Sequence, residues 1–209
     1  MNLLIDTSGS RGQLAISESG KILSTTAWDK EGSHSEKITL ELQQLLANTK
    51  ADFAKLQSVS VVVGPGSFTG LRVGINCAKT IAYSQNLPIV GLNSLWALAM
   101  SYHQSGKTIT SIIDAQRNSV FASRFSGNGE PEFENQIISI SELTFPKDSL
   151  VCGSGWTRYQ EILKDKCTFS GEWIRFESIE AQREKMTQSS WGQIQPLYIR
   201  KSAAEEKLS

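Results

Sequence analysis

The sequence predicts an α/β protein made of two similar halves, each built on a mixed β-sheet. Three observations support this class. A valine-rich run at 59–63 leads through a glycine-rich turn into a segment with helical periodicity. The chain opens on a short apolar strand followed by two strands joined by a tight turn, within residues 3–28. A weaker copy of this strand order begins at residue 110.

The first half is expected to begin with a three-strand meander. Leu3–Asp6 is a short apolar strand that ends in an acid and two hydroxyl residues. Gln13–Ser17 forms the next strand, and Glu18–Lys21 has the composition of a hairpin turn into a third strand at Ile22–Trp28.

A helix is expected over residues 33–48. Ser33 and Glu36 have the spacing of a capping box, in which each side chain satisfies a backbone N–H at the start of the helix. Leu40 lies off the apolar stripe of this helix. The stripe itself consists of Ile38, Leu42, Leu45 and Leu46.

A glycine-rich loop, Gly64–Gly74, follows a predicted strand at Ser58–Val63 and opens a helix from Leu71 to about Asn86. Such a turn points backbone N–H groups at an anion or at a close-packed partner. The spacing matches neither a Walker A motif nor the dinucleotide fingerprint, and the interval 53–113 contains no acid that could bind a ribose. The structural loop is assigned to Gly64, Pro65, Gly66, Ser67, Phe68, Thr69 and Gly70.

The second half repeats the meander. A strongly apolar helix at Ser94–His103 comes first, and a domain boundary near Gln104–Lys107 gives domains 1–104 and 105–209. The tail from Ser202 is polar and is expected to fray. The expected elements are strands at Thr110–Asp114, Ser119–Phe125 and Phe133–Ile140, a hairpin turn at Gly127–Gly129, a strand from Leu150 and a helix from Trp156 to about Lys164.

Composition restricts the function. The chain of 209 residues has 21 basic and 21 acidic residues, so its formal net charge is zero. It therefore lacks the overall positive charge that favours binding to nucleic acid. Its three scattered cysteines are typical of reduced thiols. No signal peptide or membrane-length apolar run is present, and a cytoplasmic protein without membrane contact is expected.

The sequence gives only weak evidence for a catalytic site. Only two histidines occur, too few for a typical catalytic metal site, so no metal is expected; His34 is assigned a surface or capping role and His103 a place near a helix end. Nothing in the sequence brings Ser67, His34 and Asp6 together as a triad, and Cys77 is expected to be packed inside a helix.

Four segments together resemble the TsaB (YeaZ) family, the bacterial partners of TsaD in making N6-threonylcarbamoyladenosine at position 37 of tRNA. They are Asp6–Ser8, Gly64–Gly74, Asp114–Arg117 and Pro196–Lys201. The resemblance implies a duplicated ribonuclease-H-like fold of the actin/Hsp70/sugar-kinase superfamily. It also implies a non-catalytic subunit that binds the TsaD homologue, works with the TsaE ATPase and forms a homodimer when alone.

The resemblance places the partner surface on two helices, 33–48 and 71–86. The expected interface residues are Ile38, Leu42, Leu45, Leu46, Arg72, Val73, Gly74, Cys77, Ala78 and Ile81. A charge at Leu45 or Ala78 is accordingly expected to weaken assembly without unfolding the chain. Contact with tRNA is expected only through the complex.

In the superfamily, acids at the two strand ends help to hold a nucleotide-bound metal. Here Asp6, Thr7, Ser8 and Asp114 form a candidate degenerate nucleotide site. Each acid could equally cap its own turn, and for Asp114 that reading is favoured, because Gln116 and Ser119 depart from the family pattern. No cofactor is expected for this chain, although a nucleotide could sit at the partner interface.

Two other classes remain open. One is a free-standing enzyme, either a nucleotide-dependent kinase-like protein or a metallopeptidase; the absence of a paired histidine motif argues against the peptidase. The other is a tRNA-binding module, which the neutral charge disfavours.

Overall fold

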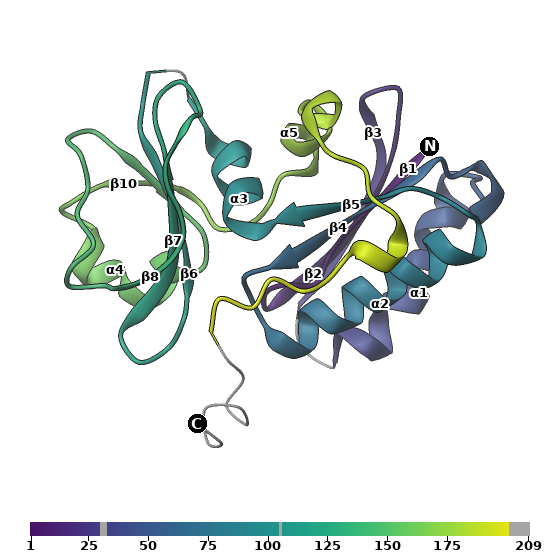
Figure 1. The fold of residues 1–209 in the computed structure, drawn as a ribbon, viewed down its shortest axis with the longest axis horizontal. Helices are drawn as coiled ribbons and strands as arrows, with labels where there is room; N and C mark the ends of the chain where they lie inside the picture. Colours follow the sequence, from purple (N-terminus) through teal and green to yellow (C-terminus); the bar gives the residue numbers. More distant parts are fainter. Residues whose placement is uncertain (30–32, 105, 201–209) are drawn as a thin grey trace. The chain divides into compact units, whose positions relative to one another are not determined.

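The computed structural model describes residues 1–29, 33–104 and 106–200. They divide into two compact units, each with one sheet and its own helices (Figure 1). Unit 1 holds Met1–Asn93 and Phe176–Leu197, and unit 2 holds Ser94–Arg175 and the chain from Tyr198. The residues expected to fray, from Ser202 on, lie outside the described part.

The sheet of unit 1 has the strand order β3-β2-β1-β4-β5. The strands β1, β2 and β3 form the antiparallel meander, and β4 and β5 add in parallel beside β1. The meander and β4 were expected from the sequence, whereas β5 was not. The bounds are β1 Asn2–Asp6, β2 Arg11–Glu18, β3 Lys21–Asp29, β4 Ser58–Gly64 and β5 Ile89–Asn93.

Two helices, α1 (His34–Asn48) and α2 (Phe68–Ser84), pack on this sheet. The capping box at the start of α1 is present, and the Ser33 N–H donates to the Glu36 carboxylate at 3.2 Å. The apolar sides of both helices and of the sheet form one core, which includes Leu45, Ala78 and Val61. Burying such apolar side chains is the main contribution to the stability of the unit.

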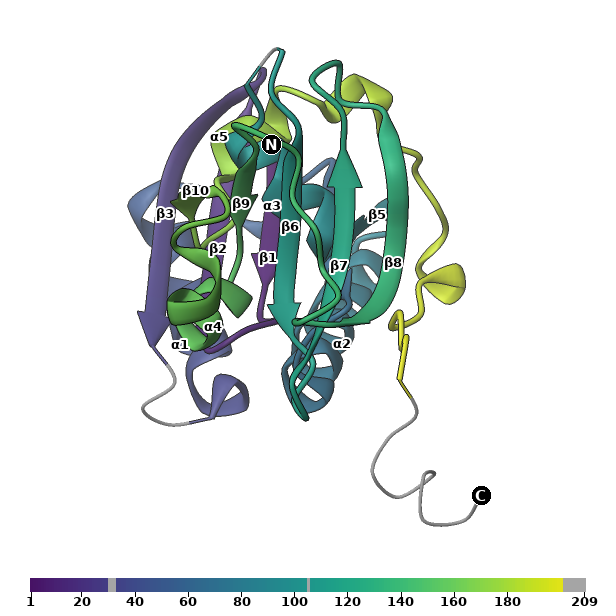
Figure 2. The ribbon, with the colours of Figure 1, turned by 90° about the vertical axis from the view of Figure 1, so that its left-hand side faces the viewer.

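The sheet of unit 2 has the order β10-β9-β6-β7-β8. Read from the other edge, it repeats the topology of unit 1: an antiparallel meander, then two parallel strands. Figure 2 shows β6, β7 and β8 side by side. The bounds are β6 Ile109–Asp114, β7 Ser119–Phe125, β8 Pro131–Ser139, β9 Leu150–Cys152 and β10 Thr168–Gly171. The duplication expected from the sequence is therefore present.

Helix α4 (Gly155–Leu163) connects β9 to β10 along the chain, as α2 connects β4 to β5. Helix α3 (Ser94–Tyr102) directly follows β5 and packs on β6 and β7. For this reason α3 belongs to unit 2, whereas the sequence placed the boundary after residue 104. The contact of Leu95 with Ala115 and Phe121 anchors it there.

The return segment, Phe176–Leu197, belongs to unit 1 although it follows unit 2 in the chain. It begins with helix α5 (Phe176–Glu180) and then runs along β5, where Ser189 and Ile89 exchange backbone hydrogen bonds of 2.8 and 3.0 Å. The Leu197 N–H donates to the Val63 carbonyl at 2.7 Å. The segment thus covers part of an edge strand that would otherwise expose unpaired backbone groups.

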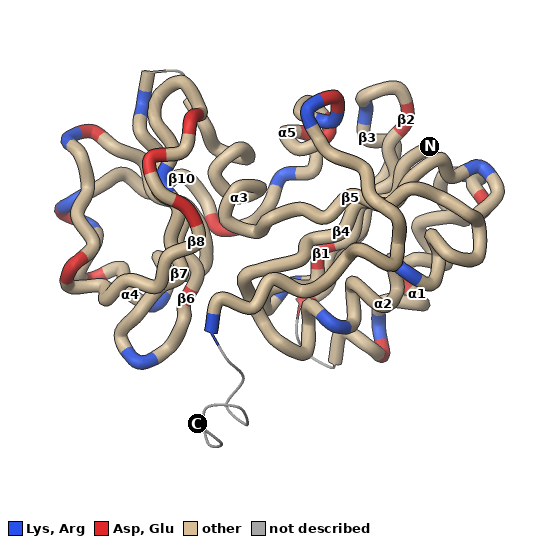
Figure 3. The backbone as a smooth tube through the Cα atoms, in the orientation of Figure 1, with Lys and Arg blue, Asp and Glu red and all other residues tan. Residues whose placement is uncertain are grey.

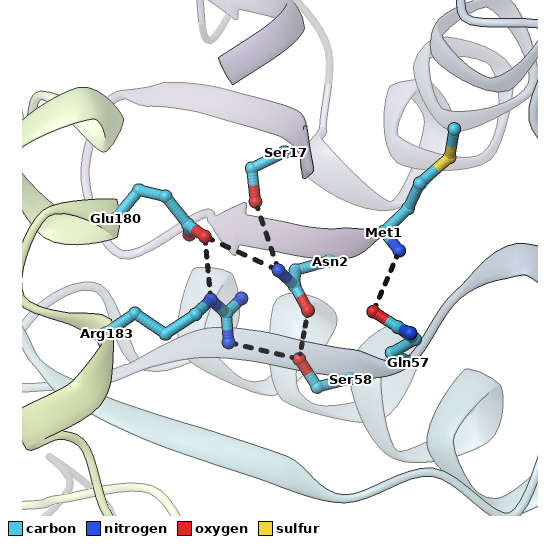
Figure 4. A network of polar contacts seen from close by, with 7 residues as sticks. All are labelled: Met1, Asn2, Ser17, Gln57, Ser58, Glu180 and Arg183. Atoms are coloured by element: carbon cyan, nitrogen blue, oxygen red, sulfur yellow. Dashed lines mark hydrogen bonds and ion pairs between the residues drawn. The ribbon is translucent and has the colours of Figure 1, made fainter. Parts of the chain in front are cut away.

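A buried polar network fixes the start of the return segment (Figure 4). The Arg183 guanidinium donates to the Glu180 carboxylate at 2.7 Å and to the Ser58 hydroxyl at 3.2 Å. The Asn2 amide lies 2.8 Å from the same hydroxyl. The network therefore ties the segment to the first residues of β1 and β4.

Candidate functional site

The glycine loop packs directly against the turn between β1 and β2. The Ser67 N–H donates to the Ser8 carbonyl at 2.7 Å, and the Thr7 hydroxyl donates to the Gly70 carbonyl at 2.8 Å. A Cβ on Gly66 would lie 2.4 Å from the Ser8 carbonyl oxygen, and one on Gly70 would lie 2.0 Å from that of Thr7. These glycines accordingly allow a close approach of the chain to itself.

Asp6, at the end of β1, is buried and already accepts several hydrogen bonds. The Ser8 backbone N–H and hydroxyl donate to one carboxylate oxygen at 2.9 and 2.7 Å, and the Gln13 amide donates to the other at 3.3 Å. Burial raises the pKa of Asp6, while these donors and the nearby His34 act in the opposite direction. The acid caps its own turn, one of the two roles that the sequence allowed.

His34 is buried, which corrects the surface role expected from its place at a helix start. The Trp28 indole N–H donates to its Nδ1 at 3.1 Å, so the other ring nitrogen, Nε2, carries the proton and donates to the Gly9 carbonyl at 3.0 Å. With both nitrogens engaged, the ring is not available as a general base. Ser67 accepts from the Gly70 N–H at 3.3 Å as the cap of α2, so the triad reading has no support.

Asp114 closes the corresponding turn of unit 2. Its carboxylate accepts from the Gln116 N–H at 2.9 Å and from the Tyr159 hydroxyl at 3.3 Å, and it lies 3.5 Å from the Arg158 Nε. The two acids of the candidate nucleotide site thus belong to different units, each with its own set of donors. The capping role favoured for Asp114 from the sequence agrees with these contacts.

Much of the expected partner surface is buried in the core of unit 1. These side chains hold the helices on the sheet and are not available to a second protein in the folded chain, so their assignment to the interface is corrected. The buried residues are Ile38, Leu42, Leu45, Leu46, Gly74, Ala78 and Ile81. The expectation that a charge at Leu45 or Ala78 spares the fold is corrected with them.

Other residues of α2 do face outward. Arg72 is exposed and lies over the Phe68 ring at 3.9 Å, and Val73 and Cys77 are half-buried. Burial raises the pKa of the Cys77 thiol to about 11, so this cysteine stays protonated at neutral pH. The assignment of Arg72, Val73 and Cys77 to the partner surface stays a prediction, and the exposed aromatic residues of α2 were not part of it.

Five exposed residues of α2 form one stripe, here called the α2 face. Its members are Phe68, Arg72, Asn76, Thr80 and Tyr83. Their spacing of three or four residues places them on one side of a helix, a signal that the sequence already contained. Tyr83 is 67% exposed and meets the ring of Trp191, from the return segment, edge-on at 4.9 Å.

Two further properties concern the described ranges alone. No three His, Cys, Asp or Glu side chains there are grouped in a way that could hold a metal ion. None of the helices in that part of the chain has the length and apolar character needed to cross a membrane.

A family model described as TsaD, tRNA N6-adenosine threonylcarbamoyltransferase, matches residues 29–178. A TsaB protein of Haemophilus influenzae, named a tRNA threonylcarbamoyladenosine biosynthesis protein, is 26% identical over 84% of this chain and 84% of its own length. The protein of the same name from Bacillus subtilis is 30% identical over 78% of this chain and 66% of its own length.

Among solved structures, a Pseudomonas aeruginosa protein described as similar to the peptidase YEAZ superposes with a TM-score of 0.82 at 19% identity. The match covers 95% of this chain and 99% of that one. With the repeated sheet topology, it shows a duplicated ribonuclease-H-like α/β fold.

Proposed function

This chain belongs to the TsaB (YeaZ) family, and from that membership we propose that it is a non-catalytic subunit in the formation of threonylcarbamoyladenosine on tRNA. In this role it binds a TsaD homologue and orders the site at which that partner transfers the threonylcarbamoyl group to adenosine 37. The observation that carries the proposal is the contact between the glycine loop and the β1–β2 turn.

The contact supports a scaffold role because it occupies the Ser67 N–H and fills the space in which the loop could hold a phosphate. In related nucleotide-binding folds such turns present free N–H groups to an anion. Here the Ser67 N–H is bonded to Ser8, and the carbonyls of Thr7 and Ser8 fill the space beside Gly70 and Gly66. A phosphate at this place would have to displace the chain's own backbone.

The α2 face is the surface that we assign to the partner. Aromatic and arginine side chains are enriched among the residues that dominate binding energy at protein interfaces. The α2 face presents two aromatic rings and Arg72, and Trp191 extends it beside Tyr83. The half-buried Val73 and Cys77 lie on the same helix and remain part of the proposed contact.

The wider assembly belongs to the same proposal. The TsaE ATPase acts as a further partner in the cytoplasm, and the α2 face mediates a homodimer when the TsaD homologue is absent. A nucleotide, where one is needed, binds at the interface with the partner and not at Asp6.

The partner surface is tested by changing its charge and its aromatic anchor. We expect Arg72→Glu and Tyr83→Ala each to weaken binding of the TsaD homologue by about tenfold or more, in the range of interface hot spots. Lys21→Glu, at the exposed first residue of β3, is the matched control and should bind as the unmodified chain does. Isothermal titration calorimetry measures the affinity, and equal binding by all three variants would refute the surface assignment.

A further inference from the structure

Three arginines lie in or contact the turn between β6 and β7 in unit 2. Arg117 lies within the turn and is exposed. Arg158, from α4, pairs with Asp114 at the start of the turn at 3.5 Å. Arg200 donates to the Ala115 carbonyl from the chain that follows the return segment. These three residues and Asp114 are called the arginine cluster.

The cluster is positively charged, with three guanidinium groups and one carboxylate. The partly buried Ile199 packs against the cluster of Leu95, Ala115 and Phe121, which places Arg200 beside the turn. The Arg158 side chain is 55% exposed, so its contact with Asp114 does not remove it from solvent. Figure 3 shows a basic stretch at the β6–β7 turn and acidic stretches along β8.

An aromatic side chain accompanies the cluster. Tyr198 is 41% exposed and lies two residues before Arg200. Surfaces that bind unpaired RNA combine basic groups, which contact the phosphates, with aromatic rings, on which bases stack. Guanidinium groups suit phosphates especially well because their planar fork can donate two hydrogen bonds to one phosphate.

We infer that the arginine cluster and Tyr198 form a contact surface for an unpaired segment of tRNA. The inference rests on the proposed function, in which tRNA is the substrate of the complex. It differs from the expectation, drawn from the neutral net charge, that this chain meets tRNA only through its partner. An exposed turn beside an aromatic ring is better suited to binding a flexible polyanion than to binding a small anion, which would need an enclosed site.

The test is binding of a fluorescently labelled anticodon stem-loop RNA to the full chain, followed by anisotropy from about 50 to 200 mM salt. We expect the double variant Arg117→Ala/Arg200→Ala to weaken binding about tenfold or more at low salt. The slope of the logarithm of the binding constant against the logarithm of the salt concentration should become less negative by about 1.4. Each phosphate contact in single-stranded RNA contributes about 0.7 to this slope. Arg117→Gln alone, at an exposed position, should give roughly half of that change in slope.

Lys147→Ala is the control, since it removes one exposed positive charge elsewhere in unit 2. Unchanged RNA binding by the double variant, or an equal loss in the control, would overturn the inference. So would competition by inorganic pyrophosphate at matched phosphate concentration, which would indicate a small-anion site. Binding of the TsaD homologue by the same variants is measured in parallel; its retention while RNA binding fails separates this inference from the proposed function.

Discussion

Gly70 lies at a position where close packing requires a residue without a side chain. It lies inside helix α2, where alanine is ordinarily preferred to glycine by about 1 kcal/mol. The helix start nevertheless approaches the β1–β2 turn so closely that a Cβ on Gly70 would lie 2.0 Å from the Thr7 carbonyl oxygen. That neighbour is backbone and cannot swing aside, so the usual preference should be reversed.

We therefore expect Gly70→Ala to lower the free energy of unfolding by about 1–3 kcal/mol, the cost of overpacking a tight contact. Gly192→Ala is the control, because a Cβ there has nothing within 4 Å. Urea denaturation of the two variants measures the difference. A Gly70→Ala variant as stable as the control would mean that the loop and the turn are not in close contact.

Asp6 adds a second test at the same scale. Burial raises its pKa above the ordinary value of 3.8, so the folded chain holds the proton more tightly than the unfolded chain does. The contribution of this group to stability is then full below pH 3.8 and is lost as the pH rises through the higher folded value.

The melting temperature of the unmodified chain minus that of Asp6→Asn should therefore fall as the pH rises from 3.8 into the neutral range. The asparagine variant has no proton to lose at this position, so the difference isolates the carboxyl group. Thermal melts at a series of pH values give the curve. A difference that grows with pH would show that the hydrogen bonds from Ser8 and Gln13 outweigh the burial.

Helix α1 illustrates the element scale. Its apolar stripe is entirely committed to the core of unit 1, whereas Leu40 on the opposite side is 59% exposed. The stripe predicted the helix and its buried side correctly. Burial in the chain's own core and burial under a partner leave the same periodic pattern, so the sequence could not distinguish the two.

Leu45→Asp should destabilise the chain by at least about 3 kcal/mol, because it removes buried apolar volume and buries a charge. Leu40→Asp, on the same helix, should change the free energy of unfolding by less than about 0.5 kcal/mol, as is usual for surface substitutions. Chemical denaturation compares the two. Similar stability of both variants would place Leu45 outside the core.

Other elements show why sequence reasoning reached part of the fold and of the site. The β-meanders, α1 and the glycine loop have clear periodicity or turn residues, and each was predicted near its observed bounds. Strand β10 has four residues, and the return segment is mostly irregular, so neither carries a periodic signal. Burial of His34 depends on Trp28 and Gly9, a contact that its helical position does not reveal.

At the scale of the whole molecule, the chain returns to unit 1 after completing unit 2. Arg183 and Glu180 pair with each other within the return segment and also contact Ser58 and Asn2 of the sheet, and the Glu180 side chain is only 1% exposed. Removing one member of a buried pair leaves the other charge without compensation, at a cost of about 3–5 kcal/mol. Replacing both by apolar residues can be nearly neutral.

Arg183→Met alone should therefore lower the free energy of unfolding by about 3–5 kcal/mol, and Glu180→Leu/Arg183→Met should recover most of the loss. A double-mutant cycle by urea denaturation, with Glu180→Leu as the other single variant, gives the coupling energy. If the effects of the two single variants simply added, the ion pair would not stabilise the start of the return segment.

The repeated topology and the contact between the glycine loop and the β1–β2 turn support the central point of the proposed function, that the scaffold serves assembly and its acids perform no chemistry. Reconstituted tRNA modification with TsaD and TsaE homologues tests it most directly. The account predicts that modification is lost when this chain is omitted and is retained when folded Asp6→Asn or Asp114→Asn replaces it. Full modification without the chain, or its loss with a folded Asp114→Asn variant that still binds the partner, would contradict the account.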